Sequence, residues 1–167
     1  MKRSRLAALA TICAWILGPI ASGIATAGSN DLFGQPADER ARQDRLPISQ
    51  NTIWSAFAQC KVSYDAKTAL YSIHVTPDVK ALSGQSITLD GWVMPLDGSD
   101  HTKHFLLTRR TPVCMFCPPG EPNEVVEVLS PHAIPWSAKR VTVTGAMTLI
   151  NNGEKGMFFR IANASVN

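Results

Sequence analysis

The sequence predicts an all-β domain with one short N-terminal helix, folded as a small OB-like β-barrel. About six short segments alternate apolar and polar residues, and turn-forming residues separate them. In addition, the pattern aliphatic-Thr-aliphatic-x-Gly occurs at residues 87–91 and again at 141–145. Glycines at matching places in two strands indicate the bends that a small closed barrel requires. A β-sandwich is the alternative architecture.

The first 27 residues have the layout of a secretory signal peptide. A basic start precedes an apolar run over residues 6–24, and Ala25-Thr26-Ala27 supplies a small-residue cleavage site. The alternative is a retained membrane anchor, but glycine and proline interrupt the apolar run. We therefore expect a signal peptide over residues 1–27 and a periplasmic protein. Only an uncleaved signal peptide would then hold the chain at the membrane.

The remaining chain is expected to contain a tether and one domain. Residues 28–47 are polar and charged, which predicts a flexible tether, and residues 48–167 are expected to form a single OB-like barrel domain. Three of the 16 basic residues and none of the 13 acidic residues precede residue 28. The exported chain is therefore formally neutral. This argues against a nucleic-acid partner, which would require a basic face.

A short helix is expected over residues 53–60, at the start of this domain. Asn51 and its neighbours are N-cap candidates. Ile53, Phe57 and Cys60 have the spacing of one helical face, so Cys60 is expected on the buried side of the helix. A small buried thiol in the core is its ordinary interpretation.

The strand candidates follow this helix and are separated by turn signals. They are the segments 71–76, 86–95, 103–110, 124–129, 140–150 and 156–164. The intervening segments contain Gly, Pro, Asn or Asp, which favour turns; they include a possible helical turn at 78–84 and a loop at 130–136. This count of strands and this length fit a single small barrel.

Cys114 and Cys117 form a C-x-x-C pair followed at once by two prolines. Such a pair is half of a tetrahedral metal site, because a short turn can aim both sulfurs at one ion. The missing ligands are expected from Cys60, His132 or His104. Thiolate ligands favour zinc or copper(I) over hard cations. The sequence therefore predicts a site for zinc or copper.

Two other interpretations of the cysteines stay open. In an oxidising compartment, a structural disulfide from Cys60 to Cys114 or Cys117 would close a long loop and stabilise the domain. A thiol–disulfide oxidoreductase is a further alternative, although the prolines after Cys117 cannot continue the helix that thioredoxin-like sites use. The sequence contains no G-x-S-x-G and no H-E-x-x-H motif. A binding function is therefore favoured over an enzymatic one.

Three stretches resemble a family of small exported bacterial proteins whose function is uncharacterised. They are LSGQSITLDGWVMPLDG, HFLLTRRTPVCMFCPPGEPNEVVEV and VTVTGAM, and the resemblance covers roughly residues 70–165. It implies a periplasmic OB-like domain, and some relatives are associated with ABC-type exporters and with transition-metal, especially zinc, homeostasis. Some members have a histidine in place of Phe116 and lack a counterpart of Cys117. The resemblance therefore carries over only Cys114 as a ligand.

We thus expect a periplasmic protein that binds or passes on zinc or copper as an accessory to envelope transport. Cys114 and Cys117 would bind the metal, helped by Cys60, His132 or His104. The first alternative is a metal-free interaction module of an ABC-type envelope transporter, stapled by a Cys60 disulfide. The second is a thiol–disulfide oxidoreductase.

Overall fold

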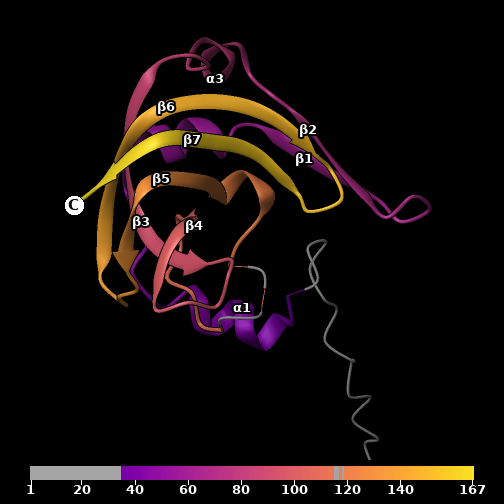
Figure 1. The fold of residues 1–167 in the computed structure, drawn as a ribbon. Helices are drawn as coiled ribbons and strands as arrows, with labels where there is room; N and C mark the ends of the chain where they lie inside the picture. Colours follow the sequence, from indigo (N-terminus) through magenta and orange to yellow (C-terminus); the bar gives the residue numbers. More distant parts are fainter. Residues whose placement is uncertain (1–34, 115–116, 118) are drawn as a thin grey trace, which may run out of the picture.

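The computed structural model describes residues 35–114, 117 and 119–167, and Figure 1 shows how their elements are arranged. The signal peptide expected over residues 1–27 lies outside the described residues. Five strands form a closed barrel in the order β3-β4-β5-β7-β6. Their bounds are β3 (Ser86–Pro95), β4 (His101–Thr108), β5 (Val125–Pro135), β6 (Arg140–Asn152) and β7 (Met157–Val166). The predicted all-β barrel is confirmed.

The pairing of the strands defines an OB-like barrel. Strand β3 pairs antiparallel with β4 on one side and with β6 on the other, and this second pairing closes the barrel. Strands β5 and β7 run parallel, with Glu127 opposite Arg160 and Val128 opposite Ile161. All other barrel pairs are antiparallel. A closed barrel of five strands with one parallel pair is the arrangement of the small OB-like barrel that the sequence predicted.

The two matching glycines lie where backbones approach each other. A Cβ atom at Gly145 would lie 2.7 Å from the backbone oxygen of Ala162 in β7. The β6–β7 ladder shifts register across Gly145, which confirms the expected bulge. A Cβ at Gly91 would overlap the backbone oxygen of Thr108 at the end of β4. Both positions therefore exclude a side chain for steric reasons.

Helix α2 (Thr52–Phe57) packs against the core of the barrel. Trp54 and Phe57 are fully buried, and the Phe57 ring stacks on Phe159 with ring centroids 4.2 Å apart. The indole N–H of Trp54 donates to the backbone oxygen of Asp90 at 2.7 Å. Cys60 is 2% exposed, so the predicted buried position of this thiol is confirmed. The helix ends three residues earlier than the sequence predicted.

Several boundaries differ from the prediction. Strand β1 (Lys61–Asp65) was not expected; it pairs with β2 (Leu70–His74) in a hairpin whose residues are mostly exposed, so it carries little alternation. Strand β5 continues through residues expected to form a loop, because its far end still pairs with β4. The possible helical turn at 78–84 is α3 (Pro77–Ala81).

The expected tether is wrong for residues 35–47. Helix α1 (Ala37–Gln43) lies within this segment, at the β4 side of the barrel (Figure 1). Charged composition suggested a solvated chain, but the side chains of Gln35, Glu39 and Gln43 are buried. The structure therefore has three α-helices and the 3-10 turn η1 (Pro122–Glu124) in its described part, where one helix was expected. None of these helices has the length and apolarity needed to cross a membrane.

Replacing Gly91 with Ala should destabilise the barrel. The added methyl group would meet the Thr108 carbonyl, which belongs to the backbone and cannot rotate away. We expect the free energy of unfolding to fall by about 1 to 3 kcal/mol. Urea unfolding followed by tryptophan fluorescence measures this. Thr148→Val, at an exposed position of β6, is the control and should change stability by less than about 0.5 kcal/mol. Equal stability of both variants would contradict the close approach.

Candidate functional site

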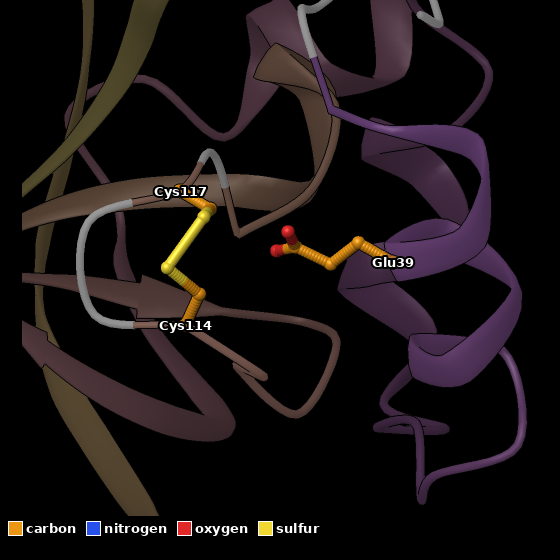
Figure 2. A group of neighbouring side chains, drawn as sticks. All are labelled: Glu39, Cys114 and Cys117. Atoms are coloured by element: carbon orange, nitrogen blue, oxygen red, sulfur yellow. A yellow bond between two sulfur atoms is a disulfide. The ribbon is translucent and has the colours of Figure 1, made fainter. Parts of the chain in front are cut away.

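The cysteine pair lies in the connection between β4 and β5, and the segment 111–119 is here called the cysteine loop. Cys114 and Cys117 form a disulfide in the structure, with their Cα atoms 5.3 Å apart (Figure 2). Both residues are partly exposed. Among the cysteines of the described chain, these two are therefore the ones that solvent can reach, since Cys60 is buried.

Cys60 takes no part in this centre. It is a free, buried cysteine in the core cluster beneath α2. Its backbone oxygen accepts a hydrogen bond from the Asn123 side chain at 2.9 Å. The expected alternative of a staple from Cys60 to Cys114 or Cys117 is therefore not what the structure forms.

Glu39 of helix α1 completes a cluster with the two cysteines. One carboxylate oxygen and the two sulfur atoms all lie within 4.8 Å of one another. Figure 2 shows the carboxylate of Glu39 pointing at the sulfur pair. Glu39 is 7% exposed, and the side-chain amide of Gln35 donates to it at 3.4 Å. Among the described residues this is the one group of three or more His, Cys, Asp or Glu side chains with metal-binding spacing.

Helix α1 is held against the cysteine loop by its last residue. The Nε2 of Gln43 donates to the backbone oxygens of Thr111 and Pro119, at 3.1 and 3.0 Å. These two carbonyls stand at the two ends of the cysteine loop. Thr111 also donates through its hydroxyl to the backbone oxygen of Pro47, at 2.7 Å. The residues after α1 are thus tied to the loop as well.

A buried carboxylate, Glu124, anchors the base of the loop. Its oxygens lie 2.8 Å from Nε of Arg110, 3.4 Å from a guanidinium nitrogen of Arg109 and 3.9 Å from one of Arg40. Arg110 also pairs with Asp44, just after α1. Burial would lower the pKa of Arg110, but the hydrogen bonds and charges of Glu124 and Asp44 outweigh it and raise that pKa. These ion pairs join the end of β4, η1 and α1.

The two histidines expected as ligands lie elsewhere. His104 contacts Glu127 through Nε2 at 2.8 Å, and Arg160 donates to the other oxygen of Glu127 at 2.7 Å. His132 is exposed in the second half of β5. Neither belongs to the ligand cluster found among the described residues. His104, His132 and Cys60 therefore lie outside the cluster that the cysteine pair forms among the described residues.

An apolar cavity of about 300 Å³ adjoins the disulfide. Cys117, but not Cys114, contributes to its wall. Most of the other lining residues are apolar and come from β3, β4, β5, β7 and the loops between them. They are Tyr71, Met94, Leu96, Leu106, Pro119, Gly120, Pro122, Val125, Lys155, Gly156 and Met157. One residue of the disulfide, Cys117, therefore borders a cavity into which an apolar group fits.

The fold and the site define a small OB-like barrel with a disulfide-bonded cysteine pair on one loop. The chain belongs to the family described as "Protein of unknown function (DUF3299)", which matches residues 30–161. Its fold is similar to the crystal structure of a DUF3299 family protein from Pseudomonas aeruginosa PAO1, with a TM-score of 0.50 and 21% identity. The match covers 72% of this chain and 82% of that chain. The comparison with curated proteins found no match.

These comparisons confirm that the chain belongs to a family of unknown function and leave its association with exporters a prediction. The residue that sequence reasoning missed is Glu39, because residues 28–47 were interpreted as a tether. A signal for it was present: Gln35, Glu39 and Gln43 recur at intervals of four residues, the spacing of one helical face. A polar helical face is usually exposed to solvent, so this spacing alone does not show that the three side chains are buried against another part of the protein.

The Glu127 ion pairs predict a pH-dependent contribution to stability. Burial would raise the pKa of Glu127, but the hydrogen bonds and charges of Arg160 and His104 outweigh it and lower the pKa below 4.5. Because the pKa of Glu127 is lower in the folded than in the unfolded protein, ionised Glu127 stabilises the fold at any pH above its pKa in the unfolded chain. This contribution is lost as the pH falls through its pKa in the folded protein. Glu127→Gln should therefore lower stability near neutral pH by about 1 kcal/mol or more.

The difference between wild type and Glu127→Gln should shrink as the pH falls below 4.5. Urea unfolding at a series of pH values measures it. Glu154→Gln, at an exposed position in the β6–β7 turn, is the matched control and should differ little from wild type at any pH. A Glu127→Gln difference that does not change with pH would contradict the lowered pKa.

Proposed function

We propose that this protein is a periplasmic metal-binding protein that holds zinc through Cys114, Cys117 and Glu39 when the two cysteines are reduced. The observation that carries this proposal is the cluster of two sulfurs and one carboxylate oxygen within 4.8 Å of one another. The three ligands come from two parts of the chain, since α1 supplies the carboxylate and the cysteine loop supplies both sulfurs.

The chemistry of these ligands favours zinc over copper(I). Zinc accepts thiolate and carboxylate ligands in one tetrahedral site, and sites with three protein ligands keep the fourth position for water or another molecule. Copper(I) prefers soft sulfur ligands, and a carboxylate is not one of them. The donor set therefore fits zinc and leaves one position through which a metal can be received or passed on.

The disulfide and the metal exclude each other. A metal ligand must be a thiolate, and the bond between Cys114 and Cys117 uses both sulfurs. The protein would then bind zinc only in its dithiol form. In an oxidising compartment this makes metal binding conditional on reduction of the pair.

An accessory role in envelope transport is the wider form of this proposal. It rests on the signal-peptide layout of residues 1–27 and on the exporter-associated relatives that the sequence resembles. The metal-free alternative, an interaction module of a transporter, loses the Cys60 staple on which it was based, since Cys60 is free in the structure. The ligand cluster therefore favours metal binding.

Zinc titration of the reduced, exported protein tests the proposal. Competition with a chromophoric chelator should give one zinc per chain, and Cys114→Ser or Cys117→Ser should abolish binding. Glu39→Gln should weaken binding by at least about tenfold, the scale on which even indirect partners of a zinc ligand act. The oxidised protein should bind no zinc. Copper(I) titrated in the same way should not respond to Glu39→Gln.

Two control variants separate this site from the one expected from sequence. His132→Ala and Cys60→Ser should retain wild-type zinc affinity, since neither side chain lies in the cluster. Circular dichroism checks that each variant is folded. Absence of zinc binding by the reduced wild type, or its loss in His132→Ala, would overturn the proposal.

A further inference from the structure

We propose that strand β1 of the exposed hairpin pairs with the same strand of a second copy of this chain and so forms a two-fold symmetric dimer. This interaction goes beyond metal binding and does not rest on it. The observations that carry it are a strand edge that no described strand covers, a charge pattern in β1 that is complementary to itself, and apolar side chains that the pairing would cover.

The outer edge of β1 is available for pairing. The hairpin is a two-stranded sheet, so β1 pairs with β2 and with no other strand of the described chain, and four of its five residues are exposed. The far side of β2 adjoins the β6–β7 turn, where the N–H of Tyr71 donates to the backbone oxygen of Gly153 at 2.9 Å. Figure 1 shows the turn of the hairpin extending beyond the barrel strands. The outer N–H and C=O groups of β1 are therefore a template for a further strand.

The charges of β1 are complementary to those of a second, antiparallel copy. The strand reads KVSYD over Lys61–Asp65. When two copies overlap fully in antiparallel register, Lys61 of each copy faces Asp65 of the other. Opposite charges directly across a strand pair stabilise a sheet, and like charges destabilise it. A parallel pairing in register would set Lys61 beside Lys61 and Asp65 beside Asp65, so the charges select the antiparallel arrangement.

The carboxylate of Asp65 is already held in place for such a contact. Its oxygens accept hydrogen bonds from the N–H of Lys67 at 2.9 Å and from the hydroxyl of Thr68 at 3.0 Å. These bonds lower the pKa of Asp65, so the group is ionised near neutral pH. Each carboxylate oxygen can still accept a further hydrogen bond from an ammonium group. An acceptor that is ordered in advance loses less entropy when the second copy binds.

The pairing also covers apolar side chains on one face of the hairpin. Val62 and Tyr64 lie on this face together with Ile73 and Tyr71, their neighbours in the β1–β2 ladder. The rings of Tyr64 and Tyr71 have centroids 4.8 Å apart, yet Tyr64 stays 38% exposed. In the fully overlapped register, Val62 of one copy lies directly opposite Tyr64 of the other. A shift by one residue would place both opposite polar residues instead, so the apolar face selects the same register as the charges.

A small polar residue lies at the two-fold axis. Ser63 faces its own copy there, on the face of the hairpin opposite to Tyr64. The Oγ atoms of Ser63 and Ser72 are 2.8 Å apart. Because a serine hydroxyl both donates and accepts, this row of hydroxyl groups can continue from Ser63 of one copy to Ser63 of the other. The small side chain also lets the two strands approach to the usual spacing of about 4.8 Å.

The contact is small, so the dimer is weak and depends on concentration. A strand edge of five residues is about 17 Å long and buries less than the roughly 1,200 Å² of a stable interface. We expect a dissociation constant between about 1 μM and about 1 mM. The chain from residue 28 onward is formally neutral, so no net charge drives two copies apart.

Charge variants of the exported protein, measured by sedimentation velocity over this concentration range in EDTA, test the pairing. Lys61→Asp and Asp65→Lys each place like charges across the strand pair. Each should weaken dimerisation at least about tenfold, because the change acts twice across the symmetry axis. An equimolar mixture of the two variants should recover the wild-type association, since each strand then faces its charge complement. Lys139→Asp, at an exposed position between β5 and β6, makes the same change of net charge as Lys61→Asp and should dimerise like wild type.

Cross-linking tests the register independently of these charges. Ser63→Cys places a thiol at the two-fold axis, and a short bismaleimide should join two copies through it. Ser72→Cys, at an exposed position of β2, is the control. Three strand spacings, about 14 Å, would separate it from its own copy, which a shorter linker cannot bridge. Cys60 is buried and the two loop cysteines are bonded to each other, so the wild type should not be cross-linked.

The following results would overturn the proposal. A wild type that sediments as a monomer over the whole range excludes the dimer. A mixture of Lys61→Asp and Asp65→Lys that does not recover, although circular dichroism shows both variants folded, excludes the antiparallel charge pairing. Equal cross-linking of Ser63→Cys and Ser72→Cys excludes the register, even if Asp65→Lys does not fold. Because EDTA is present throughout, a failure of zinc binding leaves these outcomes unchanged.

Discussion

The contact on which the site depends is the side-chain amide of Gln43. This one group donates to the backbone oxygens of Thr111 and Pro119 and thereby joins both ends of the cysteine loop to helix α1. Gln43 is 2% exposed, so loss of the amide would leave two inward carbonyls without their donor, at a cost of about 1 to 3 kcal/mol for each buried group. Glu39 lies one helical turn earlier on the same face, and the same docking brings it to the sulfurs.

The barrel supplies the rigid frame for this loop. Strand β4 ends beside Gly91 of β3, and the next two residues, Arg109 and Arg110, pair with Glu124 before β5 begins. Buried ion pairs of this kind fix geometry more reliably than they add stability, because desolvation offsets much of their attraction. A reactive loop on such a scaffold can change its sulfur chemistry while the strands beneath it stay in place. Metal binding by two loop sulfurs and a helix carboxylate fits this arrangement.

The sequence was sufficient for the barrel because alternation and turn residues act locally. It predicted the bounds of β3 as they are, the bulge at Gly145 and the burial of Cys60. It failed at Glu39 because charged composition says nothing about a partner surface sixty or more residues away, and α1 contacts such a surface through Gln43. His132 looked unusual in sequence because it stands between prolines, and the structure places it on an exposed strand end, outside the cluster of the described residues. The local sequence pattern was therefore enough to predict the fold. The site could not be predicted because it depends on the packing of α1 against a loop distant in sequence.

The central claim is that Cys114 and Cys117 form the sulfur site without Cys60. Mapping the thiols and disulfides of the exported protein tests this claim most directly. Free thiols are alkylated at once on isolation, and peptides are analysed by mass spectrometry without reduction. The structure predicts a peptide pair linked by a Cys114–Cys117 disulfide. It also predicts that Cys60 is alkylated once the protein is unfolded in the presence of the alkylating agent, because this thiol is free but buried. A disulfide from Cys60 to either cysteine of the loop would contradict this, because the core thiol would then be part of the site.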